Sequence, residues 1–182
     1  MATPATPGRE ATPTNPLAPN DASGRFGLLH LVDDAIRSVD WPHKESTFSL
    51  GPDQSFASTQ LMALEVYSYA RGIYGSAEVA DLARIDPALR GLFPRDTPAD
   101  TTIRKFRRQH REPILQCLLH IFSRAFLVRF GEPNSDPMPV DYCVAVALDR
   151  WFEPICGPRP DSEAAERIDR AIFWDGMAAA DK

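Results

Sequence analysis

The chain has 182 residues, of which 43% are hydrophobic, and a formal net charge of −5 at pH 7. This is enough for one globular domain with appendages. Three cysteines do not make a disulfide framework, and no apolar run approaches the roughly 18 residues of a membrane span. Residues 1–21 lack the basic and apolar pattern of a secretory signal, so we expect a soluble, cytoplasmic protein.

The first 24 residues are rich in Ala, Thr and Pro and contain almost nothing to bury, which predicts a disordered leader. A helical domain is expected over residues 25–131, because apolar residues there recur at helical spacing. Its first helix is predicted over Phe26–Val39, and a loop over Thr47–Gln54 follows. The second helix, from Ser58 or Thr59 to Ile73, is apolar around well over half its circumference, so we expect it at the centre of the core.

Short elements follow this central helix. Gly72 and Gly75 predict its end, and Ser76 is expected to cap the next helix. The Asp86-Pro87 pair has the form of an N-cap followed by a proline at the first helical position, which predicts another start. A basic helix capped by Asp100 and a long helix over residues 113–130 complete the domain. These parts predict an all-α fold, a small multi-helix domain with a helix-turn-helix-like centre.

The last part of the chain is acidic. Residues 132–139 are interpreted as a linker and residues 140–182 as an acidic helical tail. The stretch VDYCVAVAL at 140–148 suits either a helix or a short buried strand, and we expect a helix. Asp161 is expected to cap a final helix.

Charge is unevenly distributed. Residues 95–129 carry 8 Lys or Arg and 3 Asp or Glu, a net charge of +5, whereas 1–94 carry 7 and 11 and 130–182 carry 5 and 11. On the helix that begins at Asp100, a packing stripe of Ile103, Phe106 and His110 lies beside arginines that fall within roughly 100° of one another. Hydroxyls and free amides at its N-terminus can hold a phosphate. The predicted DNA contacts are Thr101, Thr102, Arg104, Lys105, Arg107, Arg108 and Arg111. The alternative is a solvated face whose charge is balanced elsewhere.

Metal and catalytic motifs are weak. Cys117 and His120 have a metal-like spacing, but a zinc site needs about four ligands and no matching second pair is visible. Cys117 lies on the apolar face of its helix, so we interpret it as a core residue. No phosphate loop, nucleophile elbow or zinc-protease motif is present in the sequence. We therefore predict no metal, no cofactor and no catalytic residue.

Three pieces of sequence occur in a characteristic order: YARGIYGS at 69–76, DPALRGL at 86–92 and DTTIRKFR at 100–107. With them, about residues 45–130 resemble the InsH-type N-terminal domain of bacterial insertion-sequence transposases. The resemblance implies a domain that binds DNA at the ends of the mobile element. In that family a separate ribonuclease-H-like domain, opened by an Asp-Gly-Thr strand, transfers strands with two metals held by Asp, Asp and Glu.

The corresponding place in this chain is Val140-Asp141-Tyr142, without the Gly-Thr, and only 41 residues follow Asp141. That is too short for a sheet with two more catalytic carboxylates. Asp141 is therefore not assigned a catalytic role, and the chain is not expected to be an enzyme.

The leading hypothesis is a non-catalytic protein that binds double-stranded DNA and is nucleoid-associated. A first alternative is an interaction module that dimerises or regulates an intact transposase, with the acidic tail covering the basic helix. A basic helix buried or paired with carboxylates would favour that alternative. A second alternative is one piece of an enzyme whose catalytic core is on another chain, which a neighbouring reading frame encoding that core would favour.

Overall fold

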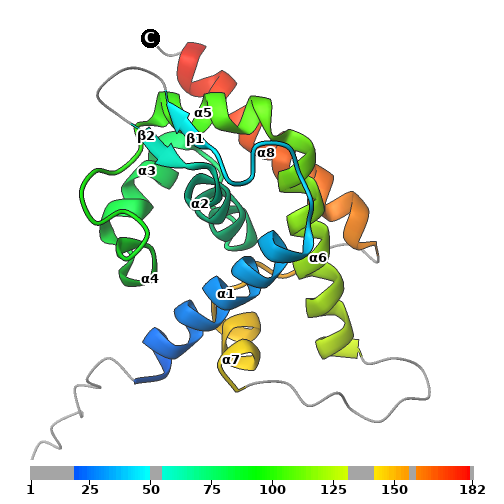
Figure 1. Cartoon of the computed structure of the whole chain (residues 1–182). Coiled ribbons are helices and arrows are strands. Elements are labelled where there is room, and N and C mark those ends of the chain that lie inside the picture. Colours follow the sequence, from blue (N-terminus) through cyan, green and yellow to red (C-terminus); the bar gives the residue numbers. More distant parts are fainter. Residues whose placement is uncertain (1–18, 50–54, 131–141, 156–158, 181–182) are drawn as a thin grey trace, which may run out of the picture.

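The computed structural model describes residues 19–49, 55–130, 142–155 and 159–180. Within them the chain is almost entirely helical, with one small antiparallel hairpin (Figure 1), which confirms the predicted all-α class. The elements are α1 (Pro19–Ser38), β1 (Thr47–Ser49), β2 (Ser55–Ala57), α2 (Ser58–Ala70), α3 (Ser76–Ile85), α4 (Pro87–Arg90), α5 (Asp100–Gln109), α6 (Arg111–Phe130), α7 (Tyr142–Arg150) and α8 (Pro160–Ala180).

The α2 helix is the centre of the core, as its all-round apolar composition predicts. Every residue from 61 to 70 is buried, and α2 contacts α1, α3, α5 and α6 (Figure 1). The α3 and α5 helices pack on each other, with α4 in the connection between them. The connection between α3 and α5 covers residues 86–99 and includes α4, so it is longer than the three- or four-residue turn of a helix-turn-helix motif, and the helix-turn-helix-like centre stays a prediction.

Both ends of α2 have identifiable caps. Gly72 ends the helix with a φ of +77°, a conformation that glycine adopts without a steric penalty. At the other end the cap is Ala57, not Ser58 or Thr59 as expected. The Gln60 side chain supplies one half of a capping box, because its Oε1 accepts a hydrogen bond from the Ala57 N–H at 3.1 Å, while Ala57 has no side-chain acceptor to supply the other half.

Two expectations about the first third of the chain are wrong. The α1 helix begins at Pro19, inside the segment expected to be a disordered leader, while residues 1–18 lie outside the described residues. Its first turns are held by Trp151, the residue after α7: Gly24 leaves room for the Trp151 ring, and the Arg25 guanidinium lies 4.1 Å from the centre of that ring. Such tertiary contacts leave no helical periodicity in the sequence.

The second correction concerns Thr47–Gln54, which was expected to be a loop. Residues 47–49 form β1 and pair with β2, placing Phe48 opposite Phe56. Each strand has three residues with one buried aromatic ring between two exposed neighbours. The alternation of a strand is present but too short to be distinguished from a loop. Residues 50–54 lie outside the described part of the chain.

Asp86 starts α4 as predicted and also joins it to two other parts of the domain. Its Oδ1 accepts a hydrogen bond from the Ala88 N–H at 2.9 Å, which is the expected cap. Its buried Oδ2 accepts from Arg71 at 2.6 Å and Arg25 at 3.1 Å. One carboxylate therefore fixes the end of α2, the start of α4 and the first turns of α1.

The acidic C-terminal segment packs on the domain. The α7 helix, predicted as helix rather than strand, lies against α1, and α8 lies against α6. The predicted linker at 132–139 is outside the described residues, as is Asp141. The α8 helix buries Arg167 completely, although arginine is rarely buried without partners.

Arg167 has those partners. Its guanidinium donates to the α2 carbonyls of Tyr69 at 2.9 Å and Ala70 at 3.1 Å, to the Glu153 carbonyl at 2.8 Å and to the Glu163 carboxylate at 2.9 Å. A cation at the C-terminus of α2 also interacts favourably with the helix dipole. Arg167 therefore fastens α8 to the central helix.

No helix in the described part of the chain is long and apolar enough to cross a membrane.

Arg167→Ala is expected to destabilise the fold by about 3–5 kcal/mol, because it removes the buried charge partner of the Glu163 carboxylate and the guanidinium donors to the carbonyls of α2 and Glu153. Arg167→Lys keeps the charge but not the forked geometry and should fall between wild type and Ala. The measurement is urea unfolding of the whole chain. Arg159→Ala is the matched control, because its ion pair with Asp161 is exposed and should contribute little to the free energy of unfolding. Equal effects of Arg167→Ala and Arg159→Ala would contradict this assignment.

Candidate nucleic-acid interface

The α5 helix carries the residues predicted to contact DNA, and its first turn is stabilised locally. Asp100 is its first residue, and Ala99 before it has the extended backbone of an N-cap. The Asp100 carboxylate accepts the Thr101 N–H at 2.8 Å and an N–H of Arg104 at 2.5 Å. An acidic side chain therefore already occupies the position where a phosphate was expected.

One side of α5 is pinned to the core by aromatic rings, as the predicted stripe requires. Ile103, Phe106 and His110 are buried. The Phe106 ring stacks on His110 with centroids 4.2 Å apart and meets Phe48 of β1 edge-on at 5.2 Å. The position of α5 is therefore fixed by the hairpin that the sequence did not reveal.

Arg107 is not on the accessible face, and its assignment as a DNA contact is wrong. Only 2% of the residue is exposed. Its guanidinium donates to the Tyr69 hydroxyl at 3.0 Å and to Ser76 Oγ at 2.8 Å, and it forms an ion pair with Asp175 of α8. In the helical projection Arg107 lies about 40° from Ile103, so of the grouped arginines it is the one nearest the core.

Thr102 is also buried, with 3% exposed, so it cannot reach a DNA phosphate in this fold. Thr101 is exposed, and its role stays a prediction.

Ser76, expected to cap α3, instead donates its hydroxyl to Asp175 at 2.7 Å, and Gly75 is the N-cap.

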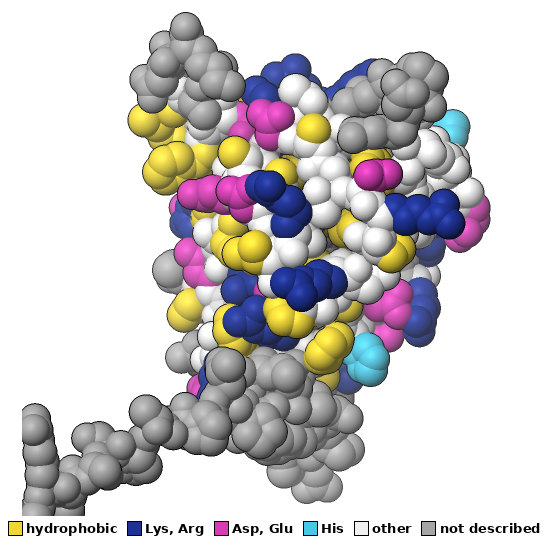
Figure 2. All heavy atoms as spheres, turned by 90° about the vertical axis from the view of Figure 1, so that its left-hand side faces the viewer, with side chains coloured by type: hydrophobic (Ala, Val, Ile, Leu, Met, Phe, Trp, Pro, Cys, Tyr) yellow, Lys and Arg dark blue, Asp and Glu magenta, His cyan; other side chains and the backbone are white. Residues whose placement is uncertain are grey.

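The remaining cations lie toward solvent. Arg104 is 27% exposed and paired with Asp100, whereas Arg111 is 57% exposed and paired with Asp169 of α8 at 2.6 Å. Lys105 and Arg108 are exposed, and neither has an ion-pair or hydrogen-bond partner among the described residues. Figure 2, by contrast, shows a face of the molecule where basic side chains are scattered among acidic and apolar ones.

A buried polar cluster beneath α5 was not found from the sequence. The Tyr69 hydroxyl, which accepts from Arg107, donates to Glu65 Oε2 at 2.8 Å. Glu65 is 1% exposed, and burial raises its pKa to about 8 although the positive charge of Arg107 opposes the rise. No local motif marks this cluster, because Ser76 and Asp175 are 99 residues apart.

The possible metal pair does not form a site in the structure. Cys117 is fully buried in the core, as predicted, and burial raises the pKa of its thiol to about 12. Within the described residues, no group of three or more His, Cys, Asp or Glu side chains is arranged to hold a metal ion.

Comparison of the chain with protein-family models, with curated proteins and with solved structures finds no match. The resemblance to the transposase N-terminal domain therefore stays a prediction that depends on the three sequence pieces alone.

Glu65→Gln is expected to flatten the dependence of stability on pH. The raised pKa means that folded Glu65 keeps its proton up to about pH 8, whereas the unfolded chain loses it near 4.5. The stability contributed by the protonated carboxyl is complete below pH 4.5 and is lost as pH rises through 8, with a slope of up to about 1.4 kcal/mol per pH unit.

The amide of Gln mimics the protonated carboxyl and removes this slope. The measurement is urea unfolding at intervals between pH 5 and 9, with exposed Glu45→Gln as the control that keeps the wild-type slope. Parallel curves for wild type and Glu65→Gln would show that Glu65 does not hold a proton in the folded chain.

Proposed function

We propose that the chain is a non-catalytic protein that binds double-stranded DNA through the solvent face of α5. This surface, here called the α5 face, consists of Thr101, Arg104, Lys105 and Arg108 of α5 together with Arg111, the first residue of α6. The observation that carries the proposal is that α5 and the first residue of α6 turn four cationic side chains toward solvent in a chain whose net charge is negative. Phosphate contacts of this kind supply most of the affinity of non-specific DNA binding.

The state of the cations determines how the α5 face would be used. Lys105 and Arg108 have no competing carboxylate among the described residues. Arg111 and Asp169 form an exposed pair, which contributes little to stability and can exchange its carboxylate for a phosphate. Arg104 is partly covered and paired within α5. Lys105 and Arg108 are therefore the first contacts, and Arg111 is a contact that binding must release from α8.

A second candidate function is the interaction module. It is favoured by a specific observation: α8 supplies Asp175 to buried Arg107 and Asp169 to exposed Arg111, so an acidic helix lies along part of the basic one. The same end of α8 also exposes large apolar side chains, a common property of protein contact surfaces. These are Ile172, Phe173, Trp174 and Met177. Absence of DNA binding at about 50 mM salt, together with self-association in sedimentation, would favour this candidate.

The double variant Lys105→Gln, Arg108→Gln should bind random-sequence duplex DNA about tenfold more weakly. The slope of log K against log salt should become shallower by about 2, because two phosphate contacts are lost. Fluorescence anisotropy between about 50 and 200 mM salt measures both quantities. The control is Arg84→Gln, Arg90→Gln, which removes the same charge from exposed positions on α3 and α4. An equal loss in both variants would indicate a general charge effect and remove the α5 face from the interface.

Asp169→Asn should tighten DNA binding about two- to fivefold, because it releases Arg111 from an exposed ion pair. The same assay measures the change. Asp161→Asn is the control: it removes one negative charge from the same helix, but its partner is Arg159 rather than a residue of the α5 face. If both variants tighten binding equally, the effect comes from net charge and Arg111 is not a contact.

A further inference from the structure

A groove lies between the segment that leads into β1 and the second half of α5. Its cavity volume is about 510 Å³. The side chains that matter here are His43, Ser46, Thr47, Lys105, Gln109 and His110, and none of the described residues that line the groove is acidic. The chain as a whole has 25 Asp and Glu against 20 Lys and Arg, whereas the described residues of this lining include one Lys and no carboxylate.

The chemistry of the lining is that of an anion site. Lys105 brings a permanent positive charge with three donors, Gln109 an amide and Thr47 a hydroxyl. Lys105 and Gln109 are one helical turn apart, so they lie on the same side of α5. Both side chains are exposed, and neither has a hydrogen-bond partner among the described residues. These donors are therefore available to a ligand.

The floor of the groove is aromatic and rigid. His110 stacks on Phe106, and its Nδ1 lies 3.1 Å from the Phe106 carbonyl, which assigns the ring proton to that nitrogen. Burial lowers the pKa of His110, so its ring is neutral near pH 7. The floor therefore gives the groove a defined shape and a low local dielectric constant. The positive charge of the groove lies at its rim, on Lys105.

The backbone on the hairpin side of the groove is constrained. His43 has a φ of 65°, the only positive value at a non-glycine position among the described residues. The turn is closed by Ser46, whose N–H and hydroxyl both donate to the His43 carbonyl, at 3.0 and 2.6 Å. A side chain is retained at a position where glycine would fit more easily, which is common where a residue has a function.

We propose that this groove binds a phosphate group, with Lys105, Gln109 and Thr47 as donors. Phosphate fits because it offers several acceptor oxygens and a negative charge to a lining rich in donors. That the phosphate belongs to a DNA backbone rests on the proposed function: Lys105 belongs to the α5 face and to the groove, so the strand held by Arg108 continues into the groove.

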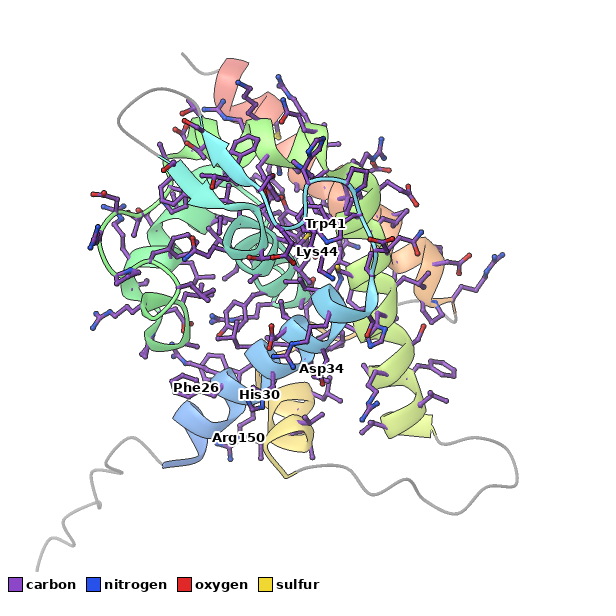
Figure 3. The ribbon with its side chains drawn as sticks, viewed as in Figure 1. Phe26, His30, Asp34, Trp41, Lys44 and Arg150 are labelled. Atoms are coloured by element: carbon purple, nitrogen blue, oxygen red, sulfur yellow. The ribbon has the colours of Figure 1, made fainter. Side chains whose placement is uncertain are left out.

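The test uses the histidine ring signals of the whole chain in NMR spectra. The chain has four histidines. His43 and His110 line the groove, whereas His120 is on α6 and His30 is on α1, beside α7 and away from the hairpin (Figure 3). The two outside the groove are internal controls. Inorganic phosphate is titrated at constant pH and constant ionic strength, with chloride as the balancing anion.

We expect saturable shifts of His43 and His110 with His30 and His120 unchanged. Lys105→Gln should weaken phosphate binding at least tenfold, and Gln109→Ala several-fold, whereas Arg90→Gln on α4 should leave it unchanged. Equal, unsaturated shifts of all four histidines, or binding that Lys105→Gln does not weaken, would overturn the proposal.

A second titration, with a duplex DNA of random sequence, separates this proposal from the proposed function. Shifts of His43 and His110 with DNA, weakened by Gln109→Ala, support both. Saturable phosphate binding without DNA binding supports the groove as a site for a small phosphorylated molecule and overturns the DNA-binding function. DNA binding that leaves His43 and His110 unshifted, with unchanged affinity in Gln109→Ala, overturns the groove and retains the α5 face.

Discussion

Two buried arginines donate hydrogen bonds to the end of α2, at Tyr69 and Ala70. The arrangement of the helices in the domain depends on these hydrogen bonds. Arg167 of α8 donates to the carbonyls of Tyr69 and Ala70, and Arg107 of α5 donates to the Tyr69 hydroxyl. Burying a guanidinium is unfavourable unless its donors are satisfied in good geometry. Arg167 therefore requires α2 and α8 to be in place together, and Arg107 requires α2, α5 and α8.

The basic residues of α5 therefore fall into two classes, one that faces the core and one that faces solvent. Arg107 faces inward and links α5 to Asp175, so its charge is used within the fold. Lys105 and Arg108 face outward, where a charge remains solvated without a partner. In the sequence Arg107 looks like part of a DNA-binding stripe on α5. In the structure it holds that stripe in position. Removing Arg107 is therefore expected to disturb folding, whereas removing Arg108 is not.

The sequence predicts the helices better than the roles of the arginines. Periodicity identifies α2 as central, and Asp86-Pro87 identifies the start of α4, because both signals are local. The α5 projection places the arginines within about 100°, but it does not say which edge meets a neighbour. That choice depends on Asp175, whose position beside Ser76 follows only from the complete fold. The hairpin was missed for a related reason, since strands of three residues gain their stability from Phe106 and Phe93.

For DNA that approaches the protein, the electrostatic potential close to the α5 face matters more than the net charge of −5. At about 0.1 M salt the Debye length is about 10 Å, so DNA at the α5 face responds mainly to the charges on and beside that helix. Asp169 and Asp175 lie within this range through their contacts with Arg111 and Arg107, whereas most other carboxylates do not contact α5. The α8 helix therefore stabilises the helix that presents the cations and lowers the potential there. In the proposed interface only a contact at Arg111 would have to compete with Asp169, because Lys105 and Arg108 have no ion-pair partner among the described residues.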